Sequence, residues 1–151
     1  MMSRYLLIIS CSRSKDKTKD KLPAIKRYTG VYYKILNKLK KEEKLCRDLD
    51  IIIISAKYGF LRANDLIDYY DQKMDKRRAE LLNKQIISNF KEYFKNKSYK
   101  EIFVNLGKEY MTAIKGFEKF IPSSTKIIVA KGGIGKKIKQ MKNWLISINK
   151  I

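Results

Sequence analysis

The side chain best suited to covalent chemistry is Cys11, which follows the apolar run Tyr5–Ile9 and the small residue Ser10. A thiolate is a strong nucleophile, and a nearby ammonium group or helix N-terminus lowers the pKa of a thiol. Lys15 comes four residues later, and Lys57 follows a second apolar run. We therefore consider Cys11 a candidate nucleophile, activated by Lys15, Lys57 or a helix N-terminus. The alternative is a small residue that ends a buried strand, since free cysteines are often buried.

The chain of 151 residues contains no histidine, which narrows the chemistry open to it. No Ser-His-Asp triad, Cys-His pair or imidazole ligand can be built from these residues. General acid or base catalysis would therefore use Asp, Glu, Lys, Tyr or Cys. The two cysteines, Cys11 and Cys46, are too few for a disulfide scaffold or a zinc site. We expect neither a metal nor a cofactor.

Four aspartates stand close together in an otherwise basic chain. They are Asp65, Asp68, Asp71 and Asp75. Such carboxylates can act as acid and base groups or hold Mg²⁺. They can equally cap turns and pair with Arg62 or Lys73. Asp65 is the strongest candidate for chemistry, because it comes close behind Arg62 and the turn at Gly59.

The elements that would position these groups are indicated by the apolar pattern. Short apolar runs at 5–9, 51–54, 102–104 and 127–129 are typical of strands buried on both faces. Helical spacing follows each run, at 23–45, 76–93, 110–117 and 134–148, and Asp75 is placed to cap the second of these helices. A loop of roughly 20 residues follows the second strand, which is longer than a compact domain usually tolerates without a function.

This alternation predicts one doubly wound α/β domain over residues 1–151. We expect a three-layer sandwich with a mostly parallel sheet of about four strands, in the order 2-1-3-4, and helices on both faces. Ligands of such sheets bind beyond the carboxyl ends of the strands. The small and polar residues there should converge on one rim and bind substrate. They are Ser12, Ser55, Tyr58, Gly59, Asn105, Gly132 and Gly133, joined by Arg62, which would hold an anion or stack on a base.

The glycine pair Gly132-Gly133 is a candidate phosphate cradle at the start of the last helix. The stretch is not a Walker A loop, because Ala130 stands where the first glycine is required and Lys137 replaces the Ser or Thr. A simple glycine turn between a strand and a helix is the alternative.

The formal charge of +20 attracts polyanions whatever its origin. Lysine supplies most of it, as an A/T-rich genome would produce without selection for binding. We expect a nucleic-acid partner, with DNA and RNA both open, and Trp144, Tyr32 or Tyr33 as stacking partners. A solvated face is the alternative for the lysines concerned. They are Lys131, Lys136, Lys137, Lys139 and Lys142.

A membrane partner is not expected. No apolar run approaches the roughly 20 residues that a membrane span needs. The N-terminal segment has only a short apolar core and then turns basic, so it indicates a buried strand, not a signal peptide. We therefore expect a cytoplasmic protein.

Residues 55–74, SAKYGFLRANDLIDYYDQKM, resemble the signature S-G-L-Y-G-x-L-R-P-x-D-x-I-x-x-Y-R-x-E-M of the YaaA family. Weaker likenesses involve Ile9-Ser10 with Lys15, Asn105-Leu106 with Glu109-Tyr110, and Ala130-Lys131. Small relatives that begin C-S-x-x-K and carry S-A-K-Y-G-L are closer still. The signature positions that match are Ser55, Tyr58, Gly59, Leu61, Arg62, Asp65, Ile67, Tyr70 and Met74.

The resemblance implies an α/β domain linked to DNA binding and peroxide stress, with Tyr70 in the substrate pocket. Similar domains act on the nitrile of a cyano-deazaguanine base, in DNA modification systems and in archaeosine synthase. The resemblance therefore implies that Cys11 attacks a nitrile to give a thioimide, with Lys15 or Asp65 managing protons. Two other functions stay open: a non-catalytic DNA- or RNA-binding stress-protection protein, and a small nucleotide-binding regulator.

Overall fold

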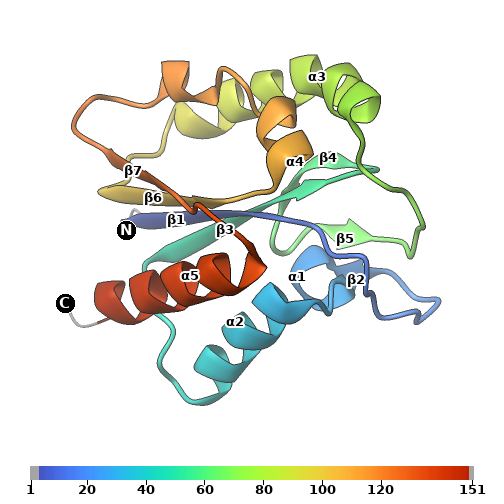
Figure 1. Ribbon diagram of the computed structural model, residues 1–151, viewed down its shortest axis with the longest axis horizontal. Helices are drawn as coiled ribbons and strands as arrows, with labels where there is room; N and C mark the ends of the chain where they lie inside the picture. Colours follow the sequence, from blue (N-terminus) through green and yellow to red (C-terminus); the bar gives the residue numbers. More distant parts are fainter. Residues whose placement is uncertain (1–3, 150–151) are drawn as a thin grey trace.

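The computed structural model describes residues 4–149, which form a five-stranded sheet between two layers of helices (Figure 1). The sheet has the order β4-β3-β1-β6-β7, and only β4 runs antiparallel to its neighbour. Its strands are β1 (Tyr5–Ser10), β3 (Leu49–Ser55), β4 (Gly59–Arg62), β6 (Glu101–Asn105) and β7 (Lys126–Val129). A separate antiparallel pair joins β2 (Leu22–Pro23) to β5 (Leu66–Ile67).

Helices cover both faces of the sheet (Figure 1). One layer contains α1 (Ala24–Arg27), α2 (Val31–Lys41) and α5 (Ile134–Ile148). The other contains α3 (Lys76–Phe94), α4 (Lys108–Ala113) and the 3₁₀ helix η1 (Phe117–Phe120). The predicted three-layer α/β sandwich and the order 2-1-3-4 of the four parallel strands are confirmed.

The sheet follows from its central strand, β1, whose first five residues are all buried. Ile8 stands opposite Ile52 of β3 on one side and Val104 of β6 on the other. Side chains of alternate residues enter opposite cores, so a strand covered on both faces must be apolar throughout. The β-branched runs of the sequence meet that demand, which is why their pattern predicted the sheet.

The predicted loop after the second strand is wrong, because it contains β4 and β5. Gly59 has a φ of 73°, a left-handed conformation that residues with a Cβ rarely adopt. The chain therefore turns back at Gly59, and β4 pairs antiparallel with β3. A Cβ on Gly59 would also lie 3.3 Å from the Ile86 side chain, so glycine suits this turn on two counts.

The predicted helix over 23–45 is shorter and broken. Pro23 belongs to β2, α1 ends at Arg27, and Tyr28 is extended. A new helix, α2, begins after Gly30.

Asp75 caps α3 as predicted, because its Oδ1 accepts the N–H of Arg78 at 2.7 Å. Within residues 4–149, no helix combines the length and the apolar character needed to cross a membrane.

Candidate functional site

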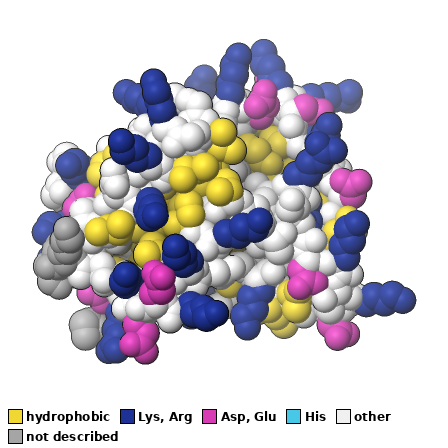
Figure 2. Space-filling view, turned by 60° about the horizontal axis from the view of Figure 1, so that its bottom comes forward, with side chains coloured by type: hydrophobic (Ala, Val, Ile, Leu, Met, Phe, Trp, Pro, Cys, Tyr) yellow, Lys and Arg dark blue, Asp and Glu magenta, His cyan; other side chains and the backbone are white. Residues whose placement is uncertain are grey.

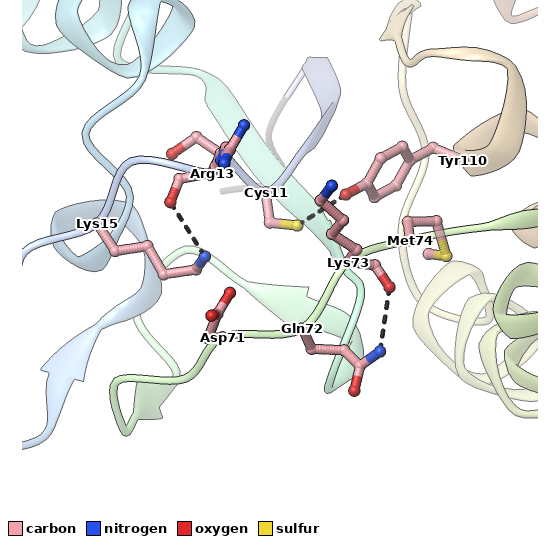
Figure 3. Close-up of a pocket in the computed structure, with 9 residues that line it drawn as sticks. Cys11, Arg13, Lys15, Asp71, Gln72, Lys73, Met74 and Tyr110 are labelled. Carbon is pink, nitrogen blue, oxygen red and sulfur yellow. Dashed lines mark hydrogen bonds between the residues drawn. The ribbon is translucent and has the colours of Figure 1, made fainter.

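A hollow of about 700 Å³ opens beyond the carboxyl end of β1 (Figure 3). We call it the Cys11 hollow. Ligand sites of proteins commonly enclose about 300–1,000 Å³, so its size suits a small molecule or one nucleotide. Residues from three separate parts of the chain line it: Cys11, Ser12, Arg13 and Lys15 after β1, Asp71, Gln72, Lys73 and Met74 before α3, and Tyr110 of α4.

Cys11 is half-buried, and its backbone N–H donates to the carbonyl of Ile54 at 2.9 Å. Its Sγ lies 3.1 Å from the hydroxyl of Tyr110 (Figure 3). Burial raises the pKa of Tyr110, and the adjacent Cys11 adds to the effect. The phenol therefore stays protonated, and it can donate its O–H toward the sulfur when negative charge develops there.

Three cations, Arg13, Lys15 and Lys73, line the same hollow together with one carboxylate, that of Asp71. The Lys15 Nζ lies 4.6 Å from the centroid of the Tyr70 ring and donates to the carbonyl of Arg13 at 3.3 Å. In Figure 3 the Lys73 side chain points toward Cys11 and Tyr110. An anionic substrate would meet a net positive charge here.

A set of buried tyrosines fixes the rim behind the Cys11 hollow. The Tyr70 hydroxyl lies 2.7 Å from that of Tyr28 and 2.9 Å from Ser55 Oγ, and Tyr33 donates to the carbonyl of Ser10 at 2.7 Å. Burial raises the pKa of both Tyr70 and Tyr28. These phenols therefore remain neutral hydrogen-bonding groups that position the ends of β1 and β3.

We expect Tyr70→Phe to lower the free energy of unfolding by about 1–3 kcal/mol, because Tyr28 and Ser55 lose their shared partner in a buried place. The phenyl ring still faces Lys15, so the loss reports the hydroxyl alone. Thermal denaturation measures it. The control is Tyr69→Phe at the exposed neighbouring tyrosine, where a shift as large as that of Tyr70→Phe would contradict this account.

Ser55 and Tyr58 support the turn after β3 and do not line the Cys11 hollow. Ser55 is fully buried, and its Oγ accepts the backbone N–H groups of Lys57 at 3.2 Å and Tyr58 at 3.0 Å. The Tyr58 ring packs edge-on against Tyr70, with centroids 5.5 Å apart. Together with Gly59, these predicted binding residues shape the rim behind the hollow.

A smaller hollow of about 270 Å³ brings together the ends of β1, β6 and β7. It is lined by Ser10, Asn105 and Gly132, so the predicted convergence of strand ends holds for these three strands. Asn105 is only 1% exposed, and its Nδ2 lies 3.5 Å from Met141 Sδ. A third hollow, of about 260 Å³, is lined by Ser10 and Cys11. It therefore adjoins both the Cys11 hollow and the smaller hollow.

The glycine pair Gly132-Gly133 forms the turn between β7 and α5. Gly132 has a φ of 94°, and Gly133 precedes the first turn of α5 without a side-chain cap. The side chain of Gln140 holds the turn, because it accepts from the N–H of Lys131 at 3.0 Å and donates to its carbonyl at 2.7 Å. The predicted site residue Ser12 lies elsewhere, and its Oγ accepts the N–H of Gly30, the residue before α2, at 3.1 Å.

Arg62 and Asp65 are not brought into the Cys11 hollow. Because β4 runs antiparallel to β3, Arg62 stands opposite Ile52, back from the rim. Both line a different hollow of about 470 Å³ with Asp50. There Asp65 Oδ2 accepts the N–H of Arg62 at 2.8 Å, and the guanidinium lies 5.5 Å from the Tyr93 ring centroid. Asp65 thus caps a turn, the alternative that the sequence left open.

The predicted lysine surface is only partly free. Lys137 Nζ donates to the carbonyl of Leu106 at 3.0 Å, whereas Lys131, Lys136, Lys139 and Lys142 are exposed. Figure 2 shows basic side chains scattered over one face among apolar ones. Trp144 and Tyr33 are buried in the core, so neither can stack on a base there. Tyr32, at the smaller hollow, is half-buried.

Several residues of the Cys11 hollow were not predicted as site residues. Tyr110 and Met74 carried a signal, since both fall on positions of the family resemblance. Arg13, Gln72 and Lys73 carried none, and Asp71 was suggested only as one of the four clustered aspartates; the packing of two loops brings these four residues together. Across residues 4–149, the structure has no group of three or more His, Cys, Asp or Glu side chains placed to hold a metal ion.

The family model of DUF6884, a family of unknown function, matches residues 6–143. No curated protein matches the chain. Among solved structures, the chain is similar to AF0587, described as a protein of unknown function, with 11% sequence identity and a TM-score of 0.52. The likeness covers 93% of this chain and 44% of that one, so the chain spans less than half the length of AF0587. At this identity it shows the fold alone.

Proposed function

The chain belongs to DUF6884, a family of unknown function, and we propose that it binds a nucleobase of a nucleic acid in the Cys11 hollow and modifies it through Cys11. One observation carries the proposal. A free thiol lies in a nucleotide-sized hollow, 3.1 Å from a protonated phenol, and cations line the same hollow. A nucleophile, a hydrogen-bond donor and a site for phosphate charge thus lie together.

Two features support a substrate class: the thiol in the hollow, and the resemblance of residues 55–74 to the YaaA signature. We propose a deazaguanine-type base that carries a nitrile. The Cys11 sulfur bonds to the nitrile carbon, one π bond of the nitrile breaks, and its electron pair moves to nitrogen. The thiol proton ends on that nitrogen, so the thioimide has the composition of protein plus substrate.

Proton transfer in this step falls to groups that line the hollow. Tyr110 donates toward the reacting centre, and Lys15 supplies positive charge near it. Asp65 has no part in the proposal, because it lines the separate hollow with Arg62.

The test is to incubate the protein with a cyano-deazaguanine nucleoside and with oligonucleotides that carry this base. We expect the intact mass to rise by the full mass of the substrate, with the added mass on the peptide that contains Cys11. A substrate with a carboxamide in place of the nitrile is the control and should leave the mass unchanged.

Other outcomes would overturn the proposed chemistry. Salt-sensitive binding of nucleic acid without an adduct or product would favour the non-catalytic binding protein. Saturable binding of a free nucleotide that salt does not weaken would favour the nucleotide-binding regulator.

A further inference from the structure

Every second residue of the loop that leaves β1 is cationic between positions 13 and 21. We call this segment the cationic loop; its cations are Arg13, Lys15, Lys17, Lys19 and Lys21. All are exposed except Lys15, which is half-buried. With Asp16 and Asp20 included, five positive charges face two negative ones, so the segment has a net charge of +3.

The cationic loop is held in place by a buried arginine. Arg27 of α1 is 0% exposed, and its guanidinium donates to four backbone carbonyls. The acceptors are Asp16 at 2.7 Å, Thr18 at 2.9 Å, Asp20 at 2.7 Å and Ile67 of β5 at 3.1 Å. Burying a charge is costly without such partners. The buried guanidinium of Arg27 therefore fixes a loop that has almost no apolar side chains of its own.

Backbone hydrogen bonds hold the same loop from the other side. The N–H of Asp16 donates to the carbonyl of Arg27 at 2.8 Å, and the N–H of Thr29 donates to the carbonyl of Ser14 at 3.0 Å. The Asp16 carboxylate is turned onto its own loop, where Oδ1 accepts the N–H of Thr18 at 2.8 Å and its hydroxyl at 2.5 Å. These bonds lower the pKa of Asp16, so its charge persists while it caps the turn.

The cationic loop begins at the Cys11 hollow and runs outward from it. Arg13 and Lys15 line the hollow, while Lys17, Lys19 and Lys21 continue along the chain. Figure 1 shows this loop extending from the end of β1 past β2 to the edge of the molecule. Because the cations alternate with other residues along this segment, they form a spaced series and not one point charge.

We infer that the cationic loop binds the phosphate backbone of a single-stranded nucleic acid next to the nucleotide in the Cys11 hollow. This rests on the proposed function. A base that enters such a hollow has to leave its stack, so the strand beside it is unpaired there. Lysines that contact phosphates supply affinity without reading sequence. The loop, more than α5, is therefore the nucleic-acid surface.

The test measures binding of a fluorescein-labelled thymidine oligonucleotide by anisotropy, from about 50 to about 200 mM salt. The variant is Lys17→Ala/Lys19→Ala/Lys21→Ala, which leaves the Arg27 hydrogen bonds to the loop backbone intact. The matched control is Lys84→Ala/Lys91→Ala/Lys115→Ala, three exposed lysines in the opposite layer. Both variants lose the same charge, and both should keep the melting temperature of the wild type.

We expect the loop variant to bind at least tenfold more weakly at low salt, and its log–log salt slope to fall by about 2, since each phosphate contact contributes about 0.7. The control should keep a slope within about 1 of the wild type. Equal losses in the two variants would mean diffuse attraction and would overturn the inference. So would tighter binding of the duplex than of the single strand, or equally tight binding of polyglutamate.

Failure of the proposed function gives a different result. If the wild type binds no oligonucleotide, the nucleic-acid partner is refuted and this inference falls with it. If the wild type binds and forms the Cys11 adduct while the loop variant matches it in affinity, only the inference fails.

Discussion

Replacement of Cys11 by alanine is expected to abolish the covalent adduct with a nitrile substrate, whereas replacement of Cys46 leaves it unchanged. Both thiols are free and half-buried, so exposure alone does not distinguish them. Their surroundings do. Cys11 lies in a hollow with the Tyr110 hydroxyl 3.1 Å from its sulfur, whereas Cys46 lines none of the hollows described above. The first thiol therefore has room for a substrate.

The measurement is intact-mass spectrometry of the wild type, Cys11→Ala and Cys46→Ala after incubation with the nitrile. Thermal denaturation of each variant shows that the fold persists. Removing one sulfur from a half-buried position costs little stability compared with loss of a core side chain. An adduct on Cys11→Ala of the same yield as on the wild type would end the case for Cys11 as the nucleophile.

The sheet could be predicted because its strands are buried on both faces. The runs Leu6–Ile9 and Ile51–Ile54 leave few alternatives to parallel strands with helices on either side. Element order and the right-handed crossover then lead to the strand order that the structure has. Local pattern and global fold agree in this part of the chain.

The segment after β3 could not be predicted in the same way. Its strands β4 and β5 are short, and Leu66 is exposed, so neither shows a clear period. The outcome depends on Gly59, whose left-handed turn sends β4 back along β3. Each further residue of β4 therefore moves away from the rim, which is why Arg62 and Asp65 are separated from Cys11.

The site itself was only partly predictable. Cys11, Ser12 and Lys15 directly follow a strand, so the topology alone places them at the rim. Asp71 and Lys73 reach the same hollow through the path of a loop, and no local pattern specifies that path. Nothing in the sequence marks Arg27 among seven arginines as the buried one. Its role arises from carbonyls that belong to the cationic loop and to β5.

Arg27→Ala is expected to lower the free energy of unfolding by about 3–5 kcal/mol. The change leaves a cavity at a fully buried position, and it removes the donor from the carbonyls of Asp16, Thr18, Asp20 and Ile67. For a chain of this length, the melting temperature should fall by about 10 °C. Arg77→Ala, at an exposed arginine of α3, is the control and should change the stability by less than about 0.5 kcal/mol.

Limited digestion with trypsin distinguishes loss of the loop from general destabilisation. Trypsin cleaves after lysine and arginine, and the cationic loop holds five such residues. If Arg27 fixes this loop, Arg27→Ala should be cut there before any other region, well below its melting temperature, because cleavage follows local opening. Oligonucleotide affinity should fall in parallel, although the five cations of the loop are all still present. Cleavage spread evenly over the chain would instead mean that Arg27 supports only the core.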